Sequence, residues 1–163
     1  MQTFPHLRRN STFKETLKAL TLLVSFGIYT CLNDIFLFLP PMIGVLFILY
    51  AHASKKNQWI KVLAIVACLI FFELDHNKPA GILPIVFVIA NWLVVKKFRL
   101  LFEENIFFVF VYVPLIYFIY FFVLYLFGMF DAGFDLNLNL ILIAYIFYES
   151  CLGIIYEKIR YQI

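Results

Sequence analysis

The chain has 163 residues, of which 64% are hydrophobic and 14% charged, and its mean hydropathy is +0.94. Ordinary soluble domains contain roughly 45–50% apolar residues, and a domain this small leaves too much of its surface in water to hide such an excess. The composition therefore excludes an ordinary soluble fold and predicts one integral membrane domain, residues 1–163, without a soluble module. The net charge of +3 does not indicate nucleic-acid binding, because the basic residues flank apolar runs, as they do in membrane proteins.

Successive apolar segments predict an all-α fold with about six transmembrane helices. A spanning helix needs about 20 apolar residues, so six of them would use most of the chain. The expected spans are residues 13–33, 40–53, 59–74, 80–95, 105–130 and 136–156. The third and fourth are short, and we expect them either to cross a locally thinned bilayer or to form a re-entrant pair.

Local signals place the boundaries of these helices. The segment Thr12–Glu15 has the pattern of a capping box and predicts the start of the first helix. Pro40 and Pro41 suit the first turn of the second helix, where a missing N–H donor costs nothing. Asp131 and Gly133 indicate a turn before the last helix.

The distribution of basic residues predicts the orientation. With six spans, twelve of the thirteen Lys and Arg residues fall on one side of the membrane: Arg8, Arg9, Lys14, Lys18, Lys55, Lys56, Lys61, Lys96, Lys97, Arg99, Lys158 and Arg160. The other side carries Lys78 with five acids, Asp34, Glu73, Asp75, Asp131 and Asp135. Positive charge stays on the cytoplasmic side, so both termini are expected in the cytoplasm.

Glu149 is the acid that lies well inside an expected span, and an ionisable residue at that depth is a functional hypothesis by default. Asn91 lies at a similar depth, as do Thr21 and Ser25. One interpretation is hydrogen bonding between helices, which is typically worth about 0.6 kcal/mol. The alternatives are a proton or substrate site, or a contact with a partner helix.

Catalytic and metal-binding motifs are weak. Glu73, Asp75 and His76 could form an acid–base pair or a metal site, but we interpret them as a solvated outer loop, since a metal needs three or four converging ligands. Cys31, Cys68 and Cys151 stand alone in apolar segments and are expected to be buried thiols. No hydrolase or transferase motif is present. We therefore expect no catalytic residues, no metal and no cofactor.

The order of these features resembles the MreD family of rod shape-determining membrane proteins. Three stretches carry the resemblance: the proline-led helix Leu39–His52, the segment Ala67–Asp75 followed by Ala80–Pro84, and the basic helix end Asn91–Phe102. The resemblance implies a six-span, non-enzymatic scaffold of the bacterial inner membrane that connects MreB-like filaments with MreC-like proteins and wall synthases. It suggests as partner-binding residues Asp75, Gly81, Pro84, Lys96, Lys97 and Arg99. Contact of the basic run with anionic lipid is the simpler interpretation of the last three.

Two other functions stay open. A six-helix chain of this size also resembles the substrate-binding membrane subunit of a vitamin-type transporter, whose pocket would need polar groups converging among apolar walls. Asn91, Glu149 and Ser25 are the candidates for such a pocket. A membrane enzyme would have to use Glu73, Asp75 and His76.

Overall fold

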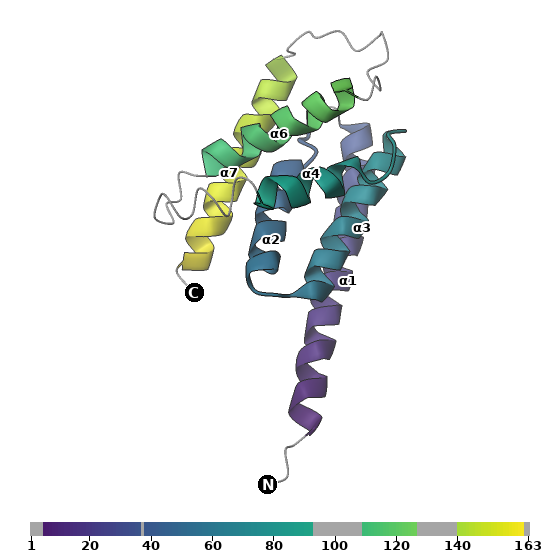
Figure 1. Ribbon diagram of the computed structural model, residues 1–163, viewed down its shortest axis with the longest axis vertical. Coiled ribbons are helices and arrows are strands. Elements are labelled where there is room, and N and C mark those ends of the chain that lie inside the picture. Colours follow the sequence, from purple (N-terminus) through teal and green to yellow (C-terminus); the bar gives the residue numbers. More distant parts are fainter. Residues whose placement is uncertain (1–4, 37, 93–108, 127–139, 162–163) are drawn as a thin grey trace.

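The computed structural model describes residues 5–36, 38–92, 109–126 and 140–161. These parts of the chain form six helices and no strand, which confirms the all-α prediction for them (Figure 1). The helices are α1 (Pro5–Ile35), α2 (Ile43–Lys55), α3 (Trp59–Asp75), α4 (Ile82–Ala90), α6 (Val109–Leu126) and α7 (Leu140–Tyr161).

Two of the expected helix starts are wrong. Helix α1 begins at Pro5, well before the segment Thr12–Glu15 that was expected to cap it, and proline is favoured in a first helical turn. Helix α2 begins after Pro40 and Pro41, because Met42 has a left-handed backbone (φ 62°) that a helix cannot contain. The ends of the expected spans at residues 93–95, 105–108, 127–130 and 136–139 lie outside the described residues.

Helix length supports membrane crossing for part of the chain. Two segments are long and apolar enough to span a bilayer, Phe13–Ile35 and Val109–Leu126. The 13 residues of α2 and the nine of α4 correspond to only about 20 and 13 Å at 1.5 Å per residue. The hydrocarbon core is about 30 Å thick, so the described parts of α2 and α4 do not reach across it alone.

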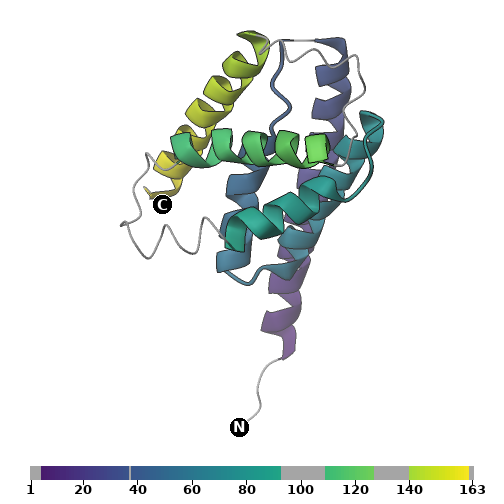
Figure 2. The same cartoon turned by 45° about the horizontal axis from the view of Figure 1, so that its top comes forward.

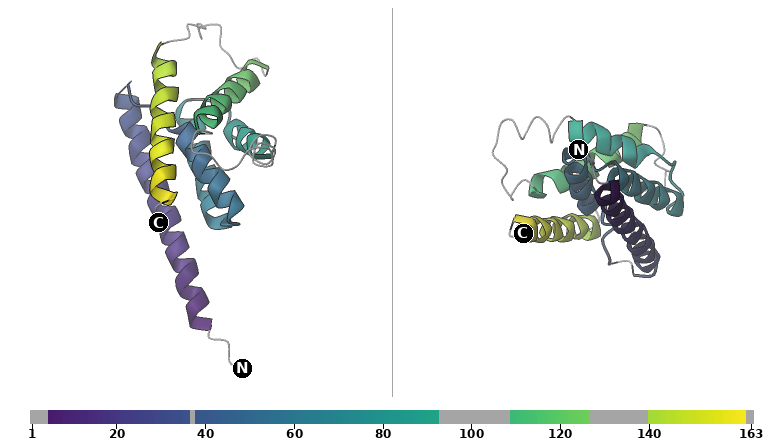
Figure 3. Two further views of the ribbon diagram at one scale, coloured as in Figure 1. Left: turned by 90° about the vertical axis from the view of Figure 1, so that its left-hand side faces the viewer. Right: turned by 90° about the horizontal axis from the view of Figure 1, so that it is seen from below.

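Helix α2 is the central element of the bundle. It contacts α3, α6 and α7, while α1 lies along α3 and α4 packs on both α3 and α6. Figure 2 shows α6 crossing the others at a steep angle. Helix α1 extends past the bundle towards its N-terminal end, so its first turns lie away from the other described helices (Figures 1 and 3).

An aromatic cluster fixes α4 against α2. The ring of Phe87 on α4 packs edge-on against Phe47, at a centroid distance of 5.2 Å, and against Tyr50, at 5.7 Å. Such edge-to-face pairs add to the free energy gained by burying the rings. Phe47 and Phe87 are fully buried, so the contact lies in the core.

Helix α7 approaches α2 and α6 closely at Gly153. A Cβ atom at this position would lie 2.5 Å from Ile48 Cδ1 and 2.6 Å from Val109 Cγ1. Contacts this short would force the neighbours to shift, and the branched side chain of Val109 has little freedom to do so, so glycine suits this helix spacing. Gly27, in α1, has open space where its Cβ would be.

We expect Gly153→Ala to lower the free energy of unfolding in detergent by roughly 1–3 kcal/mol, because the added methyl group overpacks the contact between α7 and its neighbours. Gly27→Ala is the matched control and should leave stability unchanged or slightly raised, since alanine favours the helix. Denaturant titration followed by circular dichroism measures both. Equal stability of the two variants would contradict the described packing of α7.

Candidate functional site: two buried glutamates and a tyrosine-lined cavity

Glu149 joins three helices through its carboxylate. Its side chain is fully buried at 0% exposure. One oxygen accepts a hydrogen bond from the backbone N–H of Gly44 at 2.5 Å, and the other accepts one from the hydroxyl of Tyr117 at 2.6 Å. Gly44 belongs to the first turn of α2, and Tyr117 to α6. The acid on α7 therefore stabilises the position of both helices.

The start of α2 is suited to receive this carboxylate. The first N–H groups of a helix have no partner within it, and the positive end of the helix dipole favours a negative charge there. Met42, the N-cap residue, makes no side-chain capping bond of its own. A Cβ on Gly44 would lie 2.7 Å from the Glu149 oxygen and 2.6 Å from Val113 Cγ1, so glycine is needed for the approach.

Glu73 repeats the arrangement at the start of α4. Its oxygens accept hydrogen bonds from the backbone N–H groups of Gly81 and Leu83, both at 2.6 Å, and its side chain is 0% exposed. Gly81 is left-handed (φ 108°) and again supplies no side-chain cap. The expectation of a solvated loop is thus wrong for Glu73, because the chain turns back after α3 and the start of α4 covers the carboxylate.

A cavity of about 410 Å³ lies beside the Glu149–Tyr117 hydrogen bond. The ends of α1 and α3 and parts of α2, α6 and α7 enclose it. Its wall is aromatic and apolar, with polar side chains among the apolar ones; the lining residues are Asn33, Asp34, Pro41, Ile43, Phe72, His76, Lys78, Tyr117, Tyr120, Phe121, Leu124, Leu142 and Tyr145. Small-molecule sites have about this size and this mixture of apolar walls with a few polar groups.

The other polar residues expected in the membrane do not join Glu149. Asn91 donates a hydrogen bond to Ser54 Oγ at 3.3 Å, at the far end of α2. The hydroxyls of Thr21 and Ser25 bond to carbonyl groups of their own helix, α1. Asn91 and Ser25, the candidates that would line a transporter pocket with Glu149, therefore make their hydrogen bonds elsewhere.

The residues expected to bind partners fall in two regions. Asp75 is exposed at the end of α3, with its carboxylate 3.8 Å from His76 Nδ1. Gly81 and Pro84 belong to the start of α4, where the N–H of Gly81 bonds to Glu73. The basic residues Lys96, Lys97 and Arg99 lie outside the described residues.

No group of three His, Cys, Asp or Glu side chains that could hold a metal ion occurs in the described part of the chain. The cysteines differ in burial. Cys68 is buried as expected and Cys151 is half-buried, but Cys31 is exposed on α1, which packs against few neighbours. That expectation was wrong for Cys31.

Sequence reasoning missed Tyr117 and the role of Glu73. Tyr117 is one of many aromatic residues in its helix, and nothing in the pattern distinguishes it. The helix starts did carry a signal. Neither Met42–Gly44 nor Gly81–Leu83 contains a residue able to cap its own helix, so a distant group had to do so.

Comparison with known proteins finds no family model, no curated protein and no solved structure that matches this chain. The function is therefore argued from the geometry and from the sequence resemblance.

We expect Glu149→Gln and Glu73→Gln each to lower the free energy of unfolding by roughly 1–3 kcal/mol. Both oxygens of the carboxylate accept hydrogen bonds, whereas glutamine has one oxygen, and its NH2 group would face a second donor. Glu15→Gln, the same chemical change on α1, is the control and should have little effect. Chemical denaturation in detergent compares the three variants. Wild-type stability of Glu149→Gln would refute the structural role of the carboxylate.

Proposed function

We propose that this chain is a multi-pass membrane protein of about six spans that acts without catalysis, as an MreD-type scaffold of the bacterial rod-shape machinery. Both termini would be cytoplasmic, in the inner membrane. The proposal is carried by the uncovered apolar face of α1. Only 11% of the most apolar 18-residue window of this helix is buried inside the described bundle. A scaffold needs such a face to bind another membrane protein.

The surface of the described helices supports a membrane environment. Large apolar side chains are exposed on α1, α3, α4, α6 and α7, whereas a soluble protein rarely exposes continuous apolar patches. The first turns of α1 and the last turns of α7 lie towards the same end of the molecule, which agrees with termini on one side of the membrane (Figure 1).

The buried acids support a role without catalysis. Glu73 and Glu149 are both used to hold the starts of α4 and α2. Among the described residues, no buried side-chain nitrogen or oxygen lacks a hydrogen-bond partner. Both acids therefore have hydrogen-bond partners that account for their burial by a structural role.

The exposed residues of α1 have the spacing of a helix–helix seam. Leu17, Leu20 and Val24 repeat at intervals of three and four residues and are all exposed. Gly27 continues the line with open space beside it, and small residues allow membrane helices to approach closely. This favours a transmembrane helix of a partner as the occupant. In the rod-shape machinery, MreC-like proteins and wall synthases would supply such a helix, and MreB-like filaments would contact the basic cytoplasmic side.

A photo-crosslinking amino acid at Val24 should capture protein partners in native membranes, and mass spectrometry should identify MreC-like proteins or wall synthases among them. The same probe at Ile85, which is equally exposed on α4 but outside the seam, is the control and should give mostly lipid adducts. Lipid adducts alone at both positions would refute the scaffold interface on α1.

The cavity favours a second candidate, the substrate-binding membrane subunit of a small-solute transporter. Its volume of about 410 Å³ and its three tyrosines would suit a small amphipathic molecule. Asp34, His76 and Lys78 in its lining could bind charged or hydrogen-bonding groups of that molecule.

If the cavity binds a solute, Leu142→Trp should fill it and lower affinity by roughly tenfold or more, a loss of at least about 1.4 kcal/mol. Ile143→Trp places the same side chain on the neighbouring exposed position and is the control. Native mass spectrometry of the gently purified chain measures the small molecule that each variant retains. No retained molecule in the wild type, or equal retention in both variants, would exclude this candidate.

A further inference from the structure

The turn between α2 and α3 has the composition of a membrane–water interface. Trp59, the first residue of α3, is 76% exposed. The hydrogen bond from Asn91 to Ser54 brings the end of α4 to the same level, so Trp92, 62% exposed, lies near this turn too. These are the two tryptophans of the chain. Because tryptophan concentrates at the headgroup level of a bilayer, this end of the bundle is placed there.

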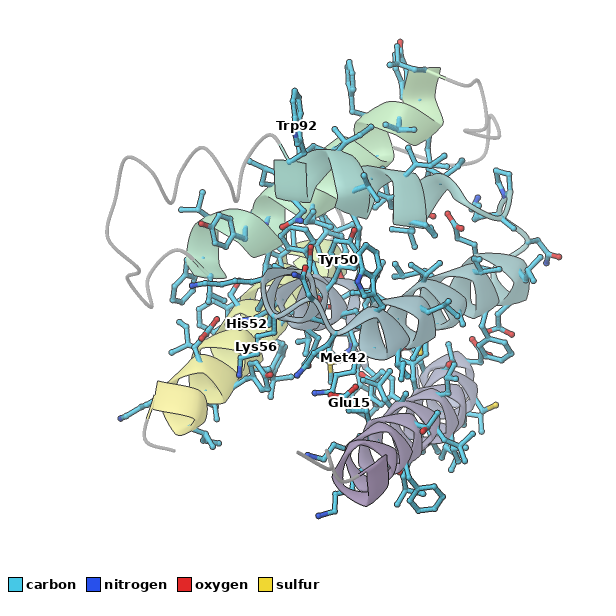
Figure 4. All side chains as sticks on the ribbon, turned by 60° about the horizontal axis from the view of Figure 1, so that its bottom comes forward. Glu15, Met42, Tyr50, His52, Lys56 and Trp92 are labelled. Atoms are coloured by element: carbon cyan, nitrogen blue, oxygen red, sulfur yellow. The ribbon has the colours of Figure 1, made fainter. Side chains whose placement is uncertain are left out.

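A small cleft of about 120 Å³ opens at this level, between the α2–α3 turn, α1 and α7. Its lining combines cationic and hydrogen-bonding side chains with apolar ones; the residues are Leu22, Leu49, His52, Ala53, Lys56, Gln58, Lys61, Ile65 and Tyr156. Figure 4 shows His52 and Lys56 close together, with the ribbon of α7 beside them. The cleft is large enough for one phosphate group.

The charges of the cleft are unequal. His52 lies 3.5 Å from the carboxylate of Glu157, so an acid already faces its ring. Lys56 and Lys61 make no ion pair with any described residue and leave the cleft with an excess of positive charge. Two lysines, with the amide of Gln58, provide donors for phosphate oxygens.

The apolar part of the lining distinguishes between sources of phosphate. Leu22, Leu49 and Ile65 line the cleft together with the polar groups. A soluble phosphate compound gains nothing from these side chains, whereas the acyl chains of a lipid continue from its headgroup along such a surface. The lysine stems can lie on the apolar wall and keep their ammonium groups at the level of the headgroups.

We propose that this cleft binds the phosphate of an anionic phospholipid at the surface of the basic end of the bundle. The inference rests on the membrane embedding of the proposed function but not on the scaffold role. It can be tested on the purified chain without any partner, so the failure of one is distinguishable from the failure of the other.

The test measures lipid retention by native mass spectrometry after stepwise delipidation, with phosphatidylglycerol and phosphatidylcholine as probes. The wild type should retain phosphatidylglycerol preferentially. The variant with Lys56→Gln and Lys61→Gln should lose roughly 25-fold of that retention, at about fivefold for each lysine near an anionic lipid. The variant with Lys14→Gln and Lys18→Gln has the same charge change on exposed α1 and should stay within about twofold of the wild type, because those lysines lie outside the cleft.

Arginine at positions 56 and 61 should restore retention, which separates loss of charge from loss of structure. Equal losses in the cleft variant and the α1 variant would mean diffuse surface attraction and would overturn the proposal. Equal retention of the two lipids by the wild type would overturn it as well. Displacement of phosphatidylglycerol by millimolar inorganic phosphate would assign the cleft to a soluble phosphate compound instead.

Discussion

A helix that starts inside an apolar bundle must find partners for its first N–H groups, because water is not there to bind them. In this protein two carboxylates meet that constraint. Glu149 reaches α2 from α7, and Glu73 reaches α4 from the end of α3. Each carboxylate satisfies a buried helix end and at the same time has its own charge stabilised by the helix dipole. Without its partner, either the carboxylate or the first N–H groups of the helix would be buried without a hydrogen bond, at a cost in free energy.

The rest of the bundle follows from these two contacts. Since α2 is held at its start by an acid on α7, the two helices must lie close together, and Gly44 and Gly153 provide the space for this. The second oxygen of Glu149 binds Tyr117 and so fixes the rotation of α6 about its axis. The tyrosine then lines the cavity that remains between these helices. The polar network thus determines the position of the cavity wall, although the cavity itself is largely apolar.

The sequence was enough to predict the helices along the chain, but not the contacts that their residues make with one another. Apolar runs separated by polar turns predicted each helix, because burial in lipid or protein requires the same composition. Composition does not show which polar residues become buried when the chain folds back on itself, and the wrong assignment of Glu73 has this cause. Glu73 was assigned to a solvated loop, since its neighbours are charged, and only the return of α4 over it makes the site buried. Met42 could not be recognised as a left-handed residue, because non-glycine residues rarely adopt that conformation.

The helices differ in how far they are held by their neighbours, and this difference bears on function. Helices α2, α6 and α7 are joined by the hydrogen bonds of Glu149, and the start of α4 is held by Glu73 of α3. Helix α1 packs along α3 and leaves most of its apolar surface uncovered. Because α1 packs along α3, its uncovered face is already ordered, so a partner helix that binds this face loses little free energy in ordering it. An exposed helix that is packed against the bundle is therefore suited to binding a partner. A transporter would instead need the helices around the cavity, α2, α6 and α7, to move relative to one another.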